Sequence, residues 1–587
     1  MYRVLGFFMA LVLSGCGSSP IEPVKVAQAG VTTESGFVVP YLTKDVLTWS
    51  DIPYAQPPVG DLRWKAPRRL AEDSGVTLSA KPGVACVQMA SDSGGVPGEG
   101  IVGQEDCLYL DIKTPLAESE QARPVMVWIH GGGNTSGYKG FYNYDELVRR
   151  EDVVVVSFNY RLGPLGWFTH PAIQGGQSDL DQSSNFGHLD IIAALQWVQR
   201  NIETFGGDPN NVTIFGESAG GHNVFAMLAS PLADGLFHKA ISQSGYVKSA
   251  TPEQAYQGQL TNPHIRRSAT QILEQLEVDA NATASELRAV SATDLYQAFY
   301  ELEGDGDVPL TTADGIVIPA EGFMAALGNP RYAKNIPVIA GANRDEVTLW
   351  LGTHRYFIEA SYPFKRLLPP KMRLKNPEVY SDWIDVRSTA WKIRGVDQPL
   401  DQLTQAGYSQ LYAYRFDWDD QETSFFADFP NVIGAAHGVD IAFLTGDFKY
   451  GPISRYIYPD SPERDELMQT MMTAWSGFAR SGVPKAPIEW PQYTPDERAF
   501  IHLDVGDQLR VAYDSATVDL LLQRVSGFDH LTYEEQCLLG WDTLTKVGQP
   551  HYEDYARWSH CAGVSATEIE RSITESLLEE YGTTSVL

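Results

Sequence analysis

The sequence predicts an α/β fold in which a mostly parallel central sheet carries helices on both faces. Two observations lead to this prediction. Several apolar runs are rich in β-branched residues and do not alternate with polar ones, as expected of strands that are covered on both faces. Between two of these runs, apolar residues recur at helical spacing. Strands that alternate with helices favour a parallel sheet. The predicted strands are residues 125–129, 153–158, 212–215 and 336–340.

The predicted helix spans residues 189–202, and Gly-Gly-Asp-Pro at 206–209 stops it. Four apolar residues share one stripe of this helix: Ile191, Leu195, Val198 and Ile202. Residues 246–335 and 347–430 are too long for simple connections. We therefore expect them to be helical excursions that form the wall of a pocket over the sheet.

Size and charge exclude some classes of function. The chain has 587 residues, with 43% hydrophobic residues, which is ordinary for a folded protein. Its 44 Lys and Arg stand against 74 Asp and Glu, giving a formal net charge of −30. Phosphate binding needs clustered cations, so we expect no nucleic-acid partner. The acidic excess is interpreted as solvated surface.

The first residues resemble a bacterial lipoprotein signal. Arg3 precedes an apolar stretch, residues 4–13, which is too short to span a bilayer. The stretch leads to Leu-Ser-Gly-Cys, ending at Cys16. We expect residues 1–15 to be a signal peptide, Cys16 to carry the lipid and residues 16–30 to be a tether.

This prediction places the protein outside the cytoplasm. The expected location is a bacterial membrane, the outer membrane first, with contact only through the N-terminal lipid anchor. The alternative is an ordinary signal peptide with an incidental cysteine, which would give a secreted or periplasmic protein.

Export changes how the other four cysteines are interpreted. An even number in an oxidising compartment suggests two disulfides. Pairing neighbours along the chain gives Cys86 with Cys107 and Cys537 with Cys561. Closing a loop of roughly 20 residues contributes about 3 kcal/mol in the chain-entropy model. No Cys or His spacing is typical of a zinc site, so we expect no metal.

A nucleophile elbow follows the third predicted strand. Residues 216–220 read Gly-Glu-Ser-Ala-Gly, the Gly-x-Ser-x-Gly pattern of a sharp strand-to-helix turn. The small residues let strand and helix approach closely, which pushes the hydroxyl of Ser218 out at the carboxyl edge of the sheet. The positive end of the following helix points at the position where an oxyanion would form.

A second motif would supply the oxyanion hole. Strand 124–129 ends in His130 and a run of three glycines, whose backbone N–H groups no side chain obstructs. Together the N–H groups of Gly132, Gly133 and Ala219 could hold the charged oxygen of a tetrahedral intermediate. A plain tight turn is the alternative, but the neighbouring elbow argues against it.

With these motifs the chain resembles the type-B carboxylesterases, the group that includes the cholinesterases. The resemblance covers roughly residues 31–525 and leaves 526–587 as a C-terminal extension. It implies an α/β-hydrolase fold for domain 31–525. The segments that carry it are residues 105–111, 159–163, 205–220 and 475–480.

The resemblance also implies scaffold contacts. The cysteine that matches Cys107 bonds one placed like Cys86, whereas pairing of Cys537 with Cys561 stays open. Two pairs resemble structural ion pairs of the family: Arg63 with Glu105, and Arg161 with Asp190.

Chain order narrows the choice of base and acid, because in this fold the acid and then the histidine follow the serine. Six histidines follow strand 336–340, and residues 435–440 resemble the catalytic histidine loop of the family, which points to His437. Asp345 and Glu346 both follow the strand and compete as the acid. The family match favours Glu346. A glutamate can serve as the acid because this residue only orients the imidazole and stabilises its charged form.

The resemblance implies a serine carboxylesterase that hydrolyses a small-molecule ester through an acyl-enzyme on Ser218, with no metal or organic cofactor. Glu217 is expected to line the substrate pocket or to be purely structural. Residues 87–106 lack the tryptophan with which choline-ester enzymes bind a cation. We therefore expect a broad carboxylesterase for short to medium esters, including aryl esters.

Two alternatives remain at this stage. One is a catalytically silent, esterase-like binding or adhesion module, against which the intact set of Ser218, Glu346 and His437 argues. The other is an amidase or a polymer-ester hydrolase using the same three residues, because fold does not decide substrate. The sequence carries no signal for the oligomeric state.

Overall fold

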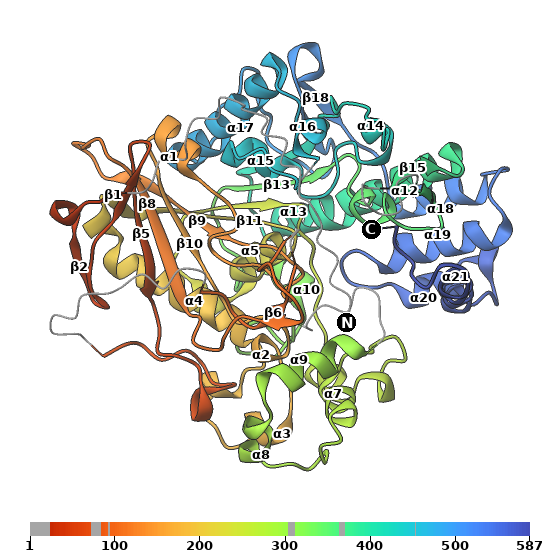
Figure 1. Cartoon of the computed structure of the whole chain (residues 1–587). Coiled ribbons are helices and arrows are strands. Elements are labelled where there is room, and N and C mark those ends of the chain that lie inside the picture. The colour runs from red at the N-terminus through yellow and green to blue at the C-terminus, as the bar shows by residue number, and fades with distance from the viewer. Residues whose placement is uncertain are drawn as a thin grey trace, which may run out of the picture.

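A 12-stranded sheet forms the centre of the molecule (Figure 1). The structure is a computed structural model that describes residues 24–71, 84–91, 94–302, 311–362, 370–451 and 453–586. The predicted signal peptide and Cys16 lie outside these residues.

The middle of the sheet is parallel, as the sequence predicts. Its neighbouring strands all pair in parallel register. In spatial order they are β10 (Val154–Phe158), β9 (Arg123–Ile129), β11 (Gly207–Glu217), β12 (Lys239–Gln243), β13 (Val338–Asn343), β16 (Leu411–Phe416) and β17 (Ala499–Leu503).

Antiparallel strands extend both edges. On one side β8 (Tyr109–Pro115), β5 (Val46–Pro53), β4 (Tyr41–Thr43) and β1 (Val24–Lys25) follow β10, and on the other β18 (Arg510–Tyr513) follows β17. Val24 and Lys25 pair with β4, so the chain enters the sheet upstream of residue 31, inside the segment expected to be a tether.

All four predicted strands are present, for the physical reason that predicted them. Every residue of β9 and β10 is buried, and each fully buried aliphatic side chain contributes roughly 1.5–3 kcal/mol. The predicted helix is α4 (Phe186–Asn201), which buries its apolar stripe against the sheet. After one 3₁₀ turn, Gly206 takes a left-handed conformation (φ 78°), and β11 begins directly after it.

The two long excursions differ from each other. The first is helical, as expected. The second also contains a hairpin and the sheet strand β16, which the sequence analysis missed. Residues 411–416 read Leu-Tyr-Ala-Tyr-Arg-Phe and lack the branched aliphatic run that marks the other strands. The elements are α6 (Pro252–Gln257), α7 (Ala269–Gln275), α8 (Ala284–Ala289), α9 (Ala292–Glu301) and α10 (Phe323–Leu327) in the first, and α11 (Thr348–Leu351), β14 (Ile358–Ser361), β15 (Lys371–Leu374), α12 (Pro377–Lys392), a π turn (Ile393–Asp397), α13 (Gln398–Gln405) and α14 (Phe429–Val432) in the second.

The C-terminal helices pack beside α12, at the right of Figure 1. They are α18 (Val518–Ser526), α19 (Tyr533–Thr545), α20 (Tyr552–Arg557) and α21 (Ala566–Tyr581). Arg387 of α12 forms an ion pair with Asp542 at 3.0 Å. Arg394 in the π turn is buried and donates hydrogen bonds to the carbonyl oxygens of Thr543 and Gln549. The extension is therefore joined to the wall of the main body by buried polar contacts.

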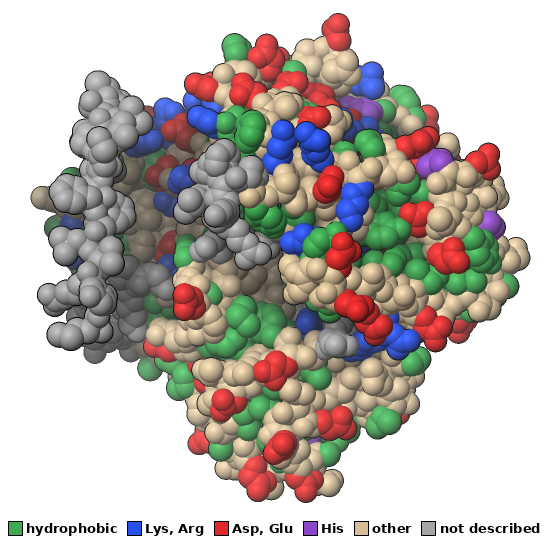
Figure 2. Space-filling view, turned by 45° about the vertical axis from the view of Figure 1, so that its right-hand side comes forward, with side chains coloured by type: hydrophobic (Ala, Val, Ile, Leu, Met, Phe, Trp, Pro, Cys, Tyr) green, Lys and Arg blue, Asp and Glu red, His purple; other side chains and the backbone are tan. Residues whose placement is uncertain are grey.

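Both neighbouring cysteine pairs are disulfides, Cys86–Cys107 and Cys537–Cys561, which confirms the pairing. The two expected ion pairs are also present: Arg63 with Glu105, and Arg161 with Asp190 at 2.7 Å. On the face shown in Figure 2, acidic side chains are scattered over the upper, right-hand and lower parts rather than gathered in one patch. Within the part of the chain that the structure describes, we find no helix with the length and apolar content needed to span a bilayer.

Candidate active site

Ser218 occupies the sharp turn between β11 and α5 (Ala219–Ala229). Its backbone has φ 59° and ψ −122°, a strained conformation for a residue with a side chain. A Cβ atom at Gly220 would collide with the carbonyl oxygen of Ile129, so this position requires glycine. Ser218 is partly exposed, whereas Glu217 and Ala219 on either side are buried. The turn thus presents one hydroxyl to solvent at the carboxyl edge of the sheet.

The glycine run lies against this turn. A Cβ atom at Gly131 would stand 2.7 Å from the carbonyl oxygen of Glu217 and 3.2 Å from the Cβ of Ser218. Gly132 and Gly133 have φ angles of 93° and 62°, which favour glycine. Within the described ranges, no hydrogen bond occupies the N–H groups of Gly132, Gly133 or Ala219. Three donors beside the serine are therefore available to a ligand oxygen.

Glu346 and His437 meet at the same edge of the sheet. Glu346 follows β13, and His437 precedes α15 (Asp440–Thr445). The Nδ1 atom of His437 lies 2.5 Å from Oε2 of Glu346. The other oxygen, Oε1, accepts from the backbone N–H of Asn343 at 2.8 Å. Nδ1 is placed to donate to this carboxylate oxygen, so in the neutral imidazole Nε2 is the nitrogen that can act as a base.

The competing carboxylate faces elsewhere. Asp345 accepts from the guanidinium of Arg344 at 2.7 Å and from the backbone N–H of Ala435 at 2.9 Å. The two adjacent carboxylates thus have separate partners, and of these two it is Glu346 that contacts the imidazole of His437.

Glu217 lies between the serine turn and the imidazole. Its Oε1 is 3.2 Å from Nε2 of His437. Nε2 is buried and has no well-aligned hydrogen bond to any described residue, and none forms with the hydroxyl of Ser218. Catalytic hydrogen bonds without substrate are often long and tighten only in the complex. The structure therefore brings the base next to the serine without yet linking the two.

Burial and neighbouring charges shift the pKa values of Glu217 and His437. Burial raises the pKa of Glu217 to about 8, against the opposing effect of His437. Burial alone would lower the pKa of His437, but the charges of Glu217 and Glu346 and the hydrogen bond to Glu346 raise it to about 9.

Two tryptophans pack on the imidazole, and the sequence analysis missed both. The ring centroids of Trp350 and Trp391 lie 5.1 and 4.9 Å from that of His437. The two indoles stack at 5.8 Å with an interplanar angle of 15°. Trp391 donates its indole N–H to the carbonyl oxygens of Ser244 and Gly245, while Trp350 is 49% exposed. Both come from the second excursion, where no local pattern marks them.

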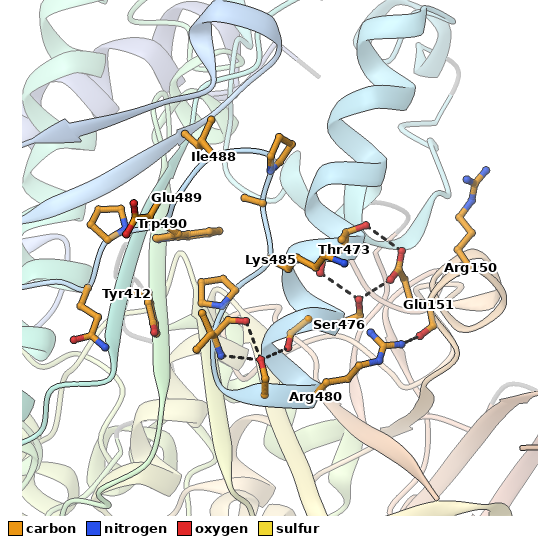
Figure 3. Close-up of a pocket in the computed structure, with 18 of the residues that line it drawn as sticks. Arg150, Glu151, Tyr412, Thr473, Ser476, Arg480, Lys485, Ile488, Glu489 and Trp490 are labelled. Carbon is orange, nitrogen blue, oxygen red and sulfur yellow. Dashed lines mark hydrogen bonds between the residues drawn. The ribbon is translucent and has the colours of Figure 1, made fainter. Parts of the chain in front are cut away.

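A large hollow of about 1200 Å³ lies elsewhere (Figure 3). It opens between α17 (Pro462–Ser481) and residues 483–492, near the amino ends of β10 and β16. Thr473, Ser476 and Arg480 point toward Glu151, opposite Trp490, and each donates a hydrogen bond to Glu151. These polar groups bond one another, and none of the predicted site residues lines the hollow. Nor do the described residues contain a cluster of His, Cys, Asp or Glu that could hold a metal ion.

Comparison with known proteins gives a consistent result. A family model described as "Carboxylesterase family" matches residues 27–362 and 370–521. Para-nitrobenzyl esterase of Bacillus subtilis is 31% identical over 502 residues, covering 81% of this chain and 94% of that protein. Liver carboxylesterase of Sus scrofa is 31% identical over 532 residues, covering 80% and 87%.

Solved structures agree. A PNB esterase superposes with a TM-score of 0.64 at 29% identity, covering 83% of this chain and 97% of that one. A Geobacillus stearothermophilus carboxylesterase gives a TM-score of 0.65 at 28% identity, covering 83% and 98%.

Proposed function

The chain belongs to the carboxylesterase family, and from this premise we propose that Ser218, His437 and Glu346 are the triad with which it hydrolyses carboxylic esters. The fold is the α/β-hydrolase fold, and the protein is a serine carboxylesterase. The observation that carries the assignment is the 2.5 Å contact between His437 and Glu346, two residues 91 positions apart that meet beside the strained serine turn.

The reaction follows from these positions. His437 Nε2 takes the proton of the Ser218 hydroxyl as its oxygen attacks the ester carbonyl. The carbonyl oxygen becomes an oxyanion held by the N–H groups of Gly132, Gly133 and Ala219. The C–O bond then breaks, and the alcohol leaves with the proton from His437. Water, deprotonated by the same nitrogen, cleaves the acyl-enzyme and regenerates Ser218.

The role proposed for Glu217 differs from both expectations, which were lining of the pocket and a purely structural part. Its side chain is buried and faces Nε2 of His437. We propose that it acts by setting the charge of the base.

The proposed substrates are short to medium esters, including aryl esters. The stacked indoles of Trp350 and Trp391 beside His437 support this class, because the planar ring of an aryl ester can stack on an indole. A series of p-nitrophenyl esters from acetate to palmitate, with an alkyl ester and an anilide beside it, measures the preference for acyl length and for an aryl alcohol. Fastest turnover of palmitate or of the anilide would contradict it.

The triad itself is tested by Ser218→Ala. We expect p-nitrophenyl acetate hydrolysis to fall by about 10⁴-fold or more. Ser476→Ala in the hollow, which removes a hydroxyl bonded to Glu151 at 2.6 Å, is the matched control and should keep its turnover. Turnover that survives in Ser218→Ala would mean a different nucleophile.

We also propose that the protein is exported and held by a lipid on Cys16. The two disulfides are typical of an oxidising compartment, and residues 1–15 resemble an export signal. Cys16→Ser expressed in a bacterial host should move the protein from the membrane fraction to the soluble one. An unchanged distribution would end the anchor proposal.

A further inference from the structure

A buried polar cluster lies directly beneath the oxyanion loop. Its members come from four segments: Asn134 follows the glycine run, Tyr160 follows β10, His188 lies in α4 and Asn223 lies in α5. All four side chains are fully buried. Burying this many polar groups does not stabilise a core more than apolar residues of the same shape would. Their presence therefore calls for an explanation beyond stability.

The hydrogen bonds run in a defined direction. Asn223 Nδ2 donates to Asn134 Oδ1 at 2.9 Å, and the Tyr160 hydroxyl lies 3.3 Å from the same oxygen. His188 Nε2 lies 3.0 Å from Asn223 Oδ1, and because an amide oxygen only accepts, the tautomer with the proton on Nε2 donates to it. Burial, with a smaller contribution from His222, lowers the pKa of His188 to about 3, so this imidazole is neutral.

The cluster joins the two halves of the oxyanion hole. Two donors, Gly132 and Gly133, belong to the loop after β9, and the third, Ala219, begins α5. Asn134 follows Gly133 directly, and Asn223 lies one helical turn after Ala219. Their bond is thus a direct tie between loop and helix. Such donors contribute to catalysis only while they stay aimed at one point in space.

The backbone of Asn134 adds to this tie. Its φ of 57° is a left-handed conformation that asparagine tolerates better than most residues. Its carbonyl oxygen accepts from Gly163 N at 2.7 Å, so the main chain is anchored as well as the side chain. Asn134 Nδ2 and His188 Nδ1 are buried without a partner among the described residues. These two atoms therefore take no part in the tie, which rests on the bonds of Asn134 Oδ1 and Asn223.

We propose that Asn134, Asn223 and His188 are positioning residues that hold the two halves of the oxyanion hole in register. This inference rests on the proposed function of the hole. None of the three touches the substrate. Their effect is on the transition state, where the oxyanion needs all three N–H groups at once, and not on the binding of the uncharged ester.

The test uses the full-length protein and two variants. Asn223→Leu replaces the amide by an apolar side chain of similar size, and Asn134→Gly removes the side chain at a position where glycine adopts the same backbone. We expect kcat for p-nitrophenyl butyrate, per titrated active site, to fall about ten- to hundredfold, less than the loss of a whole donor. KM should change less than threefold.

A transition-state analogue separates positioning from packing. A trifluoromethyl ketone adds to the serine and places an oxyanion in the hole, so its Ki should rise by the same factor as kcat falls. The acid limb of the pH profile should not move, because His437 is untouched. The double variant should lose no more than the worse single variant, since the residues act as a unit.

Asn201→Ala provides the matched control. Asn201 is a buried asparagine at the end of α4 that donates to Trp197 O at 2.9 Å, away from the hole. We expect it to lower the thermal midpoint and leave kcat unchanged.

Unchanged kcat and unchanged ketone affinity in Asn134→Gly would overturn the proposal, even if Asn223→Leu fails to fold. If the proposed function itself were wrong, the result would differ, because Ser218→Ala would then retain turnover.

Discussion

The amino edge and the carboxyl edge of the central sheet differ in how far their polar groups are hydrogen-bonded. The amino edge has the hollow of about 1200 Å³, where Glu151 is satisfied by α17. The carboxyl edge has Ser218 and Asn134 at positive φ, and buried atoms of Glu217 and His437 without a hydrogen-bond partner among the described residues. Unsatisfied buried polar atoms lie where chemistry is expected, and the described lining of the hollow has none, although its Asp152 also has a positive φ of 47°.

The difference between the two edges separates a space whose polar groups are already bonded from a site whose polar groups are available. Polar groups that already bond one another are less available to bind or activate a substrate. A site that keeps its donors and its base unpaired costs stability and can use those groups in a reaction. Substitutions at one edge at a time should therefore separate effects on activity from effects on stability.

The largest expected effect comes from the acid of the triad. Glu346→Gln would remove the charge that orients and stabilises the imidazolium, and kcat should fall by about 10⁴-fold. The neighbouring Asp345→Asn is the matched control, because its carboxylate binds Arg344 instead of His437. Equal losses in both variants would mean that the acid has been misassigned.

A second effect concerns pH. The charge of Glu217 raises the pKa of His437, and hydrolysis needs the neutral imidazole, so activity should rise as pH rises through that pKa. Glu217→Gln removes the charge and lowers the pKa of His437. The acid limb of kcat/KM should then move to lower pH. A limb that stays in place or moves upward would contradict the role given to Glu217.

At the amino edge we expect the opposite pattern. Glu151→Gln weakens the bonds from Gln469, Thr473 and Ser476, and should destabilise the fold by about 1–3 kcal/mol. Thermal unfolding should show a lower midpoint while kcat stays within twofold of the wild type. A large loss of kcat in folded Glu151→Gln would show that the hollow serves the reaction.

The smallest effect is expected at the aromatic wall. Trp350→Ala removes an indole stacked on Trp391 beside His437, and an aromatic contact contributes about 0.5–1.5 kcal/mol. KM for phenyl acetate should rise about two- to tenfold, with little change for ethyl acetate. Tyr513→Ala, an exposed aromatic on β18, is the control and should leave both values unchanged. A parallel loss on both esters would argue against ring stacking.

The sequence made much of this architecture predictable because the signals were local. Unbroken apolar runs gave β9, β10, β11 and β13, and the long motifs around Ser218 and His437 identified the segments that converge. The strand β16 was not predicted, because its aromatic and charged residues do not form such an apolar run. Trp350 and Trp391, like the bond between Asn134 and Asn223, depend on segments that are distant along the chain and become neighbours only in the fold.

The bonds of Arg394 to the last helices have a consequence for where this protein can be divided. The family match stops at residue 521, which invites a cut there. Such a cut would strip the acceptors Thr543 O and Gln549 O from a guanidinium that is 2% exposed, a loss on the order of 3 kcal/mol. That guanidinium stands three residues after Trp391, so a shortened chain would loosen the wall beside the base. We therefore expect the folding unit to continue past the boundary of the family match.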